Sequence, residues 1–225
     1  SNGSGCGNDV ASERSMCAQY ILDSVLFWAE EYHMDGFRFD LMGLLDAELM
    51  QRIRAALDER FGRGEKLVYG EPWAASSTAC RRGTRLADKA ALSSLDPEIG
   101  AFCDAVRDAV KGSVSKRQSP GFVNGGRNFE ERILQSVTAW CGGEGAFHAA
   151  APSQVITYLS CHDDMTLWDK LVATLDPNLD WDRGTEKVLR ANRLAAAICM
   201  TCQGRLFLLS GEGFGRTKQG GGKTF

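Results

Sequence analysis

The stretch DGFRFD, residues 35–40, predicts a short β-strand that ends on a carboxylate. Because side chains alternate along a strand, Phe37 and Phe39 point to one side while Arg38 and Asp40 point to the other. A guanidinium beside a carboxylate favours the ionised form of that carboxylate, which suits a nucleophile or an electrostatic stabiliser. A purely structural Arg–Asp pair is the alternative that the spacing alone leaves open.

Helical sequence lies on both sides of this strand. Ser12 and Asp46 are expected to be the N-caps of two helices, of which the second ends at Gly62. The apolar residues of the first helix recur at helical spacing and predict its buried face. These residues are Cys17, Tyr20, Ile21, Val25, Trp28 and Tyr32.

The remaining chain continues the alternation of strands and helices. Further strands are expected at residues 66–71, 90–95, 155–160 and 206–209. Further helices are expected at residues 99–111, 129–140, 166–175 and 185–202. Such alternation implies an α/β fold of parallel strands with crossover helices. No G-x-G-x-x-G follows any strand, which argues against dinucleotide binding, whereas a (β/α)₈ barrel places its chemistry at the carboxyl ends of its strands.

Two further strands end on residues capable of catalysis. In VYGEPW, residues 68–73, Glu71 is followed by Trp73, and an apolar ring beside a carboxylate favours the protonated form. Trp73 also offers a stacking platform for a sugar ring. In YLSCHDD, residues 158–164, His162 and Asp163 are expected to hydrogen-bond substrate hydroxyls, and Asp164 to cap the next helix. Glycoside hydrolysis requires a set of carboxylates of this kind, with the retaining pair about 5 Å apart. The structural alternative is that Glu71 caps a loop at the end of its strand and that Trp73 serves only in packing.

Composition narrows the class of protein. The 225 residues carry a formal net charge of −3, which gives no reason to expect nucleic acid or an anionic membrane as a partner. No apolar stretch approaches the roughly 18 residues of a membrane span. Three histidines without zinc spacing argue against a metal-dependent hydrolase. Eight cysteines are too sparse for a disulfide framework, and Cys199 and Cys202 are expected to be packed thiols. Unpaired thiols favour a cytoplasmic location over export.

The three strand-end stretches resemble sequence regions of the α-amylase superfamily, in the order of that family. The resemblance covers residues 35–40, 69–73 and 158–163. It implies a retaining double displacement on α-glucosidic bonds, with Asp40 as nucleophile and Arg38 as its partner. It further implies that Glu71 is the general acid/base, that Asp163 stabilises the transition state, and that His162 contacts a hydroxyl.

Longer stretches are similar to the type I pullulanases within this superfamily. They lie at residues 32–43, 102–114, 121–125, 152–170 and 211–218. The similarity implies hydrolysis of α-1,6 branch linkages in an α-glucan, with no required cofactor, although a calcium site is conceivable. Asp164 stands where this family usually has Asn.

The resemblance also predicts how the chain is organised. The first conserved region of the family would precede Ser1, so residues 1–225 are expected to be an incomplete (β/α)₈ TIM barrel, about strands 4 to 8. The first strands and any flanking carbohydrate-binding or carboxyl-terminal β domains would then be missing. An unclosed barrel exposes strand edges and apolar surface, so the isolated segment is expected to be inactive.

Other functions remain open from the sequence. The nearest alternatives are an isoamylase, a glycogen-debranching enzyme or an α-amylase, which differ in bond specificity. A non-catalytic carbohydrate-binding homologue would be expected to have lost a catalytic carboxylate, whereas Asp40, Glu71 and Asp163 are all present. The sequence carries no signal for the oligomeric state.

Overall fold

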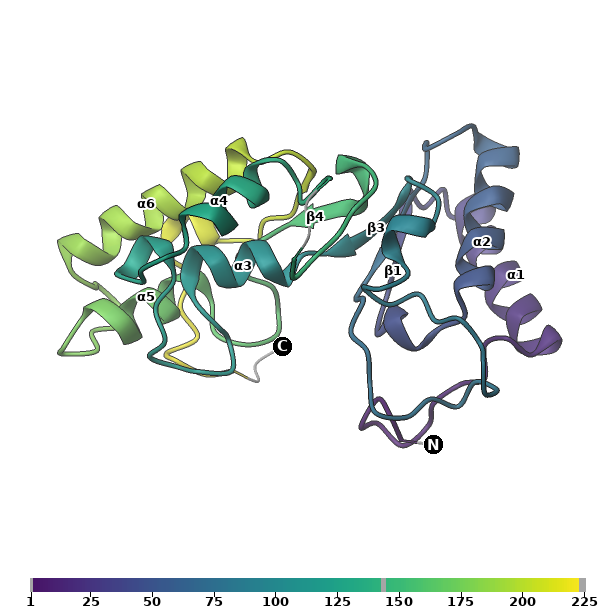
Figure 1. Cartoon of the computed structure of the whole chain (residues 1–225), viewed down its shortest axis with the longest axis horizontal. Helices are drawn as coiled ribbons and strands as arrows, with labels where there is room; N and C mark the ends of the chain where they lie inside the picture. Colours follow the sequence, from purple (N-terminus) through teal and green to yellow (C-terminus); the bar gives the residue numbers. More distant parts are fainter. Residues whose placement is uncertain (1, 143–144, 223–225) are drawn as a thin grey trace. The chain divides into compact units, whose positions relative to one another are not determined.

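The structure, a computed structural model, describes residues 2–142 and 145–222 (Figure 1). The chain divides into two compact units, and each is described by itself. The first consists of Ser1–Phe102 and His148–Val155, and the second of Cys103–Phe147 and Ile156–Phe225.

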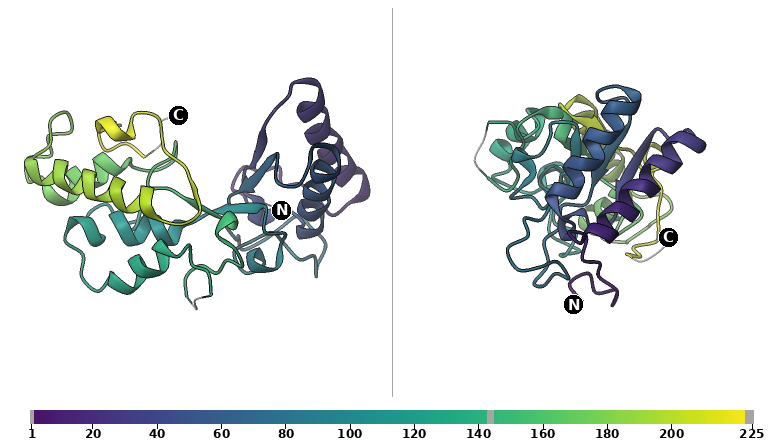
Figure 2. Two further views of the ribbon diagram at one scale, coloured as in Figure 1. Left: turned by 90° about the horizontal axis from the view of Figure 1, so that it is seen from above. Right: turned by 90° about the vertical axis from the view of Figure 1, so that its right-hand side faces the viewer.

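Three parallel strands form the sheet of the first unit. They are β1 (Gly36–Phe39), β2 (Leu67–Gly70) and β3 (Ile99–Phe102). In this register Phe37 pairs with Val68, and Val68 pairs with Ile99. The helices α1 (Ser15–Glu31) and α2 (Ala47–Phe61) lie side by side in the same unit (Figures 1 and 2). The crossover helix α2 joins β1 to β2, as parallel pairing requires.

The helix α2 begins and ends where local chemistry predicts. The Asp46 side chain accepts a hydrogen bond from the Glu48 backbone N–H at 3.3 Å, and Gly62 ends the helix with φ 102°. Leu49, Ile53 and Leu57, which recur at helical spacing, are at most 1% exposed. The expected N-cap and the expected end of this helix are therefore confirmed.

The predicted start of α1 is wrong, and of its predicted face only Val25 is buried. Arg14, not Ser12, precedes the helix, and Ser12 is fully buried, where its Oγ accepts a hydrogen bond from the Asp46 backbone N–H at 2.8 Å. Tyr20 and Tyr32 are exposed instead of packed. The buried residues of α1 are Ala18, Val25, Leu26 and Ala29. Because α1 carries apolar side chains around most of its circumference, periodicity alone does not identify the packed face.

The third strand also lies later than predicted. Leu92–Ser94 is a 3₁₀ turn, and β3 is formed by Ile99–Phe102, which had been assigned to a helix. All four residues of β3 are buried. A strand that is buried on both faces has no polar alternation, so its apolar run resembles the face of a helix. The helix α3 (Asp104–Lys111) begins only after the strand.

The described residues of the second unit form four packed α-helices and a short parallel strand pair. The helices are α3, α4 (Glu130–Val137), α5 (Leu167–Leu175) and α6 (Glu186–Thr201) (Figures 1 and 2). Ile156 and Thr157 of β4 (Val155–Thr157) pair in parallel with β5 (Arg205–Leu206). All described strand pairings within the two units are parallel, and strands alternate with helices along the chain, so the predicted α/β class is confirmed.

Threonines cap the two carboxyl-terminal helices. Thr166 accepts a hydrogen bond from the Asp169 backbone N–H at 3.1 Å, and Thr185 accepts one from Val188 at 3.4 Å. The expectation that Asp164 caps α5 is therefore wrong, because Asp164 lies two residues earlier, with φ 60°.

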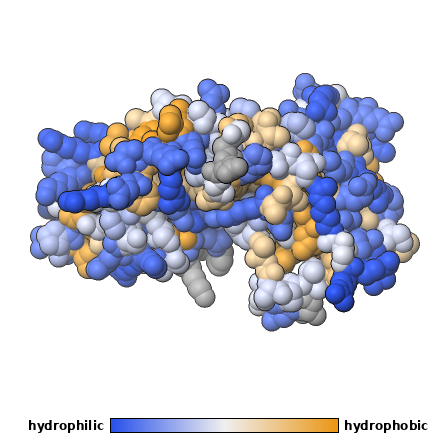
Figure 3. Space-filling view, viewed as in Figure 1, coloured by the Kyte–Doolittle hydropathy of each residue, from blue (hydrophilic) through white to orange (hydrophobic). Residues whose placement is uncertain are grey.

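Apolar side chains reach the surface of both units. Met16 and Phe27 of α1 are exposed, as are Leu194 and Met200 of α6. Figure 3 shows hydrophobic residues among hydrophilic ones on one face of the molecule. Within the described residues, no helix is long and apolar enough to cross a membrane.

Gly70, the last residue of β2, packs closely against the chain that follows β1. A Cβ at this position would lie 2.6 Å from the Met42 Cβ and 2.6 Å from the Phe39 carbonyl oxygen. We expect Gly70→Ala to lower the free energy of unfolding by about 1–3 kcal/mol, because the backbone must move to relieve this overlap. Urea denaturation of the full-length protein measures the change. Gly213→Ala is the matched control, since its Cβ would meet no atom within 4 Å, and equal stability of the two variants would contradict the prediction.

Candidate active site

Arg38 bridges the two carboxylates that end β1 and β2. Its NH1 lies 3.0 Å from Asp40 Oδ1, and its NH2 lies 2.9 Å from Glu71 Oε1. The strand register explains this arrangement, because Phe39 pairs with Gly70 and the next residue of each strand carries the carboxylate. The structure thus brings together three of the predicted site residues in the first unit.

The two carboxylates lie in different environments. The Asp40 side chain is 72% exposed, whereas the Glu71 side chain is 12% exposed. Glu71 Oε2 also accepts a hydrogen bond from the Leu41 backbone N–H at 2.9 Å. Both oxygens of Glu71 are therefore engaged by the protein, while Asp40 remains open to a ligand.

The Leu41 backbone N–H, which donates to Glu71, belongs to a tight turn after β1. Leu41 has a left-handed backbone conformation with φ 45° and ψ 44°, which is uncommon for a branched residue and is often found at functional sites. The Gly43 backbone N–H donates to the Glu71 carbonyl oxygen at 2.8 Å. A Cβ on Gly43 would lie 2.3 Å from the Trp73 carbonyl oxygen, so only glycine permits this close approach.

The indole ring of Trp73 lies beside a lysine. The ammonium of Lys89 lies 5.2 Å from the centre of the indole ring, within the range of a cation–π interaction. Trp73 and Lys89 line a pocket of about 380 Å³ together with Pro72, Ala74, Asp88 and Ala90. The chain after Glu71 therefore offers an aromatic surface with charged groups at its edge.

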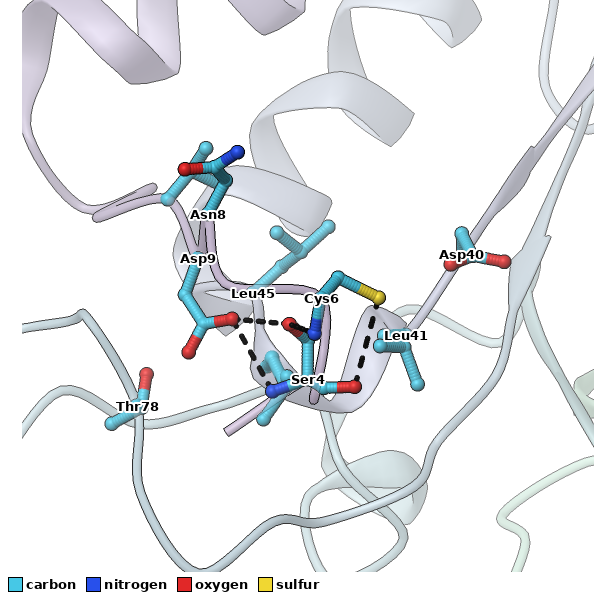
Figure 4. Close-up of a pocket in the computed structure, with 10 residues that line it drawn as sticks. Ser4, Cys6, Asn8, Asp9, Asp40, Leu41, Leu45 and Thr78 are labelled. Atoms are coloured by element: carbon cyan, nitrogen blue, oxygen red, sulfur yellow. Dashed lines mark hydrogen bonds between the residues drawn. The ribbon is translucent and has the colours of Figure 1, made fainter. Parts of the chain in front are cut away.

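Asp40 and Leu41 also border a second, smaller pocket (Figure 4). Its other lining residues are Ser4, Cys6, Asn8, Asp9, Val10, Leu44, Leu45 and Thr78. Asp9 holds the amino-terminal loop in place by accepting hydrogen bonds from the Ser4 backbone N–H at 3.2 Å and from the Ser4 hydroxyl. The volume of this pocket is about 210 Å³, below the ~300–1,000 Å³ of ordinary ligand pockets, so the pocket suits a small chemical group.

His162 and Asp163 belong to the second unit. His162 Nε2 lies 3.5 Å from Asp163 Oδ2, and the two side chains are 43% and 48% exposed. Asp164, which follows them, is in the left-handed region, where Asp and Asn are tolerated better than other non-glycine residues. The family that the sequence resembles usually has Asn at this position. Asp is therefore also compatible with the backbone of this turn.

Leu41 of the first unit and Lys218 of the second unit were not predicted as site residues. The Leu41 amide contributes through its backbone alone. Lys218 donates from Nζ to the carbonyl oxygens of His162 and Asp164, although it lies more than fifty residues further along the chain. Its only sequence signal is its place in the stretch at residues 211–218.

Among the described residues, no group of three or more His, Cys, Asp or Glu side chains could hold a metal ion. The possible calcium site stays a prediction, because backbone oxygens can also serve as its ligands.

The cysteines are free thiols, and they differ widely in accessibility. Cys6 is exposed, whereas Cys199 is 1% exposed and burial raises its pKa to about 12. Burial also raises the pKa of Cys202 to about 11. The expectation of a packed thiol holds for Cys199, whereas Cys202 is only partly buried.

Alkylation rates follow from these differences. At pH 8 we expect iodoacetamide to modify Cys6 at least ~100-fold faster than Cys199, because only the thiolate reacts and Cys199 is both protonated and buried. Mass spectrometry of the full-length protein after timed labelling measures both rates. The same labelling in denaturant is the control, and it is expected to equalise them. Equal rates in the folded protein would contradict the packing of Cys199.

The chain is similar to known pullulanases in sequence and in structure. The pullulanase of Bacillus subtilis is 37% identical over 223 residues, which are 98% of this chain and 29% of that protein. A crystal structure of the Paenibacillus barengoltzii pullulanase in complex with maltohexaose and α-cyclodextrin matches with a TM-score of 0.88 and 40% identity. That match covers 99% of this chain and 33% of the solved chain. A chloroplastic isoamylase of Arabidopsis thaliana is 25% identical. No protein-family model matches the chain.

The parallel strands that alternate with helices, together with the match to this solved structure, define the class as an α/β region of a glycoside-hydrolase barrel. The chain is homologous to type I pullulanases and matches a part of their catalytic barrel. It spans about a third of the length of the relatives it matches. The resemblance noted in the sequence is thereby confirmed.

Proposed function

We propose that the full-length protein hydrolyses α-1,6-glucosidic branch linkages in pullulan and other branched α-glucans. The observation that carries the proposal is the Arg38 bridge, which joins an exposed and a buried carboxylate at neighbouring strand ends. The homology to pullulanases supports it, since related crystal structures hold maltohexaose or maltose. The proposed partner is an α-glucan, and the proposed reaction requires no cofactor. The eight free thiols favour a cytoplasmic location for this reaction.

In the proposed first step, Asp40 attacks the anomeric carbon while Glu71 protonates the departing glycosidic oxygen. The C–O bond to the leaving glucan breaks as the bond to the Asp40 carboxylate forms. In the second step, Glu71 takes a proton from water, whose oxygen displaces Asp40 and restores the free carboxylate. Two inversions give net retention at the anomeric carbon.

The geometry of the first unit supports this division of roles. Asp40 is the carboxylate that solvent, and therefore a sugar, can reach. Arg38 NH1 lies 3.0 Å from Asp40 Oδ1, and this contact orients the Asp40 carboxylate. Glu71 is held by Arg38 on one oxygen and by the Leu41 amide on the other, so the protein sets its orientation. Preorganised groups of this kind reduce the cost of reaching the transition state.

The remaining predicted residues are proposed to bind the substrate. Trp73 would stack on a sugar ring, with Lys89 beside it. Asp163 would stabilise the distorted sugar, and His162 would bond to a hydroxyl. The half-exposed side chains of His162 and Asp163 are compatible with such contacts.

Release of maltotriose from pullulan by the full-length protein tests the proposal. Cleavage of pullulan supports the α-1,6 assignment. Cleavage of amylose but not of pullulan would retain the mechanism and overturn the bond specificity. Binding of both glucans without cleavage would indicate a carbohydrate-binding homologue. The 225-residue chain alone is expected not to release maltotriose, because it matches only 33% of the solved pullulanase chain.

A further inference from the structure

The ammonium of Lys218 joins the two peptide groups that flank Asp163. Its Nζ donates to the His162 carbonyl oxygen at 2.7 Å and to the Asp164 carbonyl oxygen at 2.8 Å. Hydrogen bonds from a charged donor are stronger than those between neutral groups. The orientation of the backbone on each side of Asp163 is therefore tied to one side chain from the carboxyl-terminal segment.

The segment that carries Lys218 is itself anchored to α5. The Asp169 side chain, which is fully buried, accepts a hydrogen bond from the Thr217 hydroxyl at 2.6 Å and one from the Lys218 backbone N–H at 2.8 Å. Asp169 lies in the first turn of the helix that Thr166 caps. Because α5 begins directly after the 162–165 turn, the helix and the lysine fix this turn from two sides.

A second lysine binds the end of the same turn. Lys111 is 1% exposed, and its Nζ donates to the Met165 carbonyl oxygen at 2.9 Å. Burial lowers the pKa of Lys111 to about 8. Lysine ammonium groups thus bind the carbonyl oxygens of residues 162, 164 and 165. The side chains of His162 and Asp163 are 43% and 48% exposed, and the Cys161 thiol donates to the Asp163 carbonyl oxygen at 3.7 Å.

We propose that Lys218 is a positioning residue that sets the direction of the Asp163 carboxylate toward the substrate. The inference rests on the proposed function, in which Asp163 stabilises the transition state. Without the ammonium, the His162 and Asp164 carbonyl groups lose their common donor and the turn can rotate about Asp164. A carboxylate displaced by about 1 Å stabilises the transition state less, whereas it changes the binding of the substrate little. The expected loss in rate is roughly 10²-fold.

The test uses Lys218→Met and Lys218→Arg in the full-length protein. Lys218→Met is expected to lower kcat on pullulan roughly 10- to 100-fold with little change in KM. Lys218→Arg keeps a cationic donor and is expected to recover a large part of this loss. Lys187→Met, at an exposed position of α6, is the control and is expected to leave kcat unchanged. A purely structural lysine would instead lower the thermal stability and leave kcat unchanged for the folded fraction.

Hydrogen exchange gives a second readout that does not depend on activity. The Leu167 backbone N–H, which donates to Ser160 Oγ at 2.7 Å, reports on the end of the turn. Its exchange is expected to be faster in Lys218→Met than in Lys187→Met. An unchanged kcat, or unchanged exchange at Leu167, would overturn the proposal. If the wild-type protein cleaves no glucan, the proposed function fails, and the exchange at Leu167 alone decides whether Lys218 holds the turn.

Discussion

Changing Asp40 to Asn in the full-length protein is expected to lower kcat on pullulan by about 10⁴-fold or more. An amide cannot form the covalent glycosyl intermediate, and losses of this order are typical when a covalent nucleophile is removed. The rate of maltotriose release at saturating pullulan measures the effect. KM is expected to change much less, because a single exposed side chain contributes little to the binding of a long glucan.

The structure separates this loss from unfolding. The Asp40 side chain is 72% exposed, and its ion pair with Arg38 is partly exposed, so Asp40→Asn is expected to shift the melting temperature by no more than a few degrees. Asp23→Asn, which changes an exposed carboxylate on α1, is the matched control and is expected to retain full activity. Near-normal hydrolysis by a folded Asp40→Asn variant would exclude Asp40 as the nucleophile.

Changing Glu71 to Gln is expected to give a loss that depends on the leaving group. On pullulan, kcat is expected to fall by about 10²–10⁴-fold, the usual contribution of a general acid or base. On α-maltotriosyl fluoride, the formation of the glycosyl intermediate is expected to be nearly normal, because fluoride departs without a proton. Steady-state rates on both substrates, with and without azide, measure the difference.

Azide distinguishes the two halves of the reaction. It is an anionic nucleophile that needs no general base, so it is expected to release the intermediate in Glu71→Gln and to form an α-glycosyl azide. Glu59→Gln, at an exposed position of α2, is the control and is expected to behave as wild type on both substrates. Equal losses on pullulan and on the fluoride would show that Glu71 is not the acid and acts only through its contacts with Arg38 and Leu41.

Many elements of the fold are encoded locally. The strand at residues 36–40 and the strand at residues 66–71 lie within a residue of β1 and β2, because alternation and a polar end mark a short parallel strand. The carboxylate of Asp46 caps α2, and Gly62 ends it, as their side-chain chemistry dictates. These signals depend on neighbours within a few residues, so the sequence contains them in full.

Two predictions failed where the pattern of apolar and polar residues does not distinguish the alternatives. The strand β3 is buried along its whole length, so its apolar residues fit a helix as well as a strand. The helix α1 is apolar around most of its circumference, and the packed face is the one that carries Ala18 and Ala29. Tertiary packing selects that face, because small side chains allow another element to approach closely.

By itself, the sequence determined the alternation of strands and helices, the strand ends at Asp40 and Glu71, and the resemblance that assigned them chemistry. Only the tertiary structure decided which groups meet there. Arg38 reaches Glu71, and the Leu41 amide donates to it, through the parallel register of two strands separated by a whole helix. Lys218 reaches the turn at Asp163 through a buried carboxylate on α5. Such contacts join residues 30 to 56 positions apart, and their geometry depends on how distant segments pack, which no local pattern records.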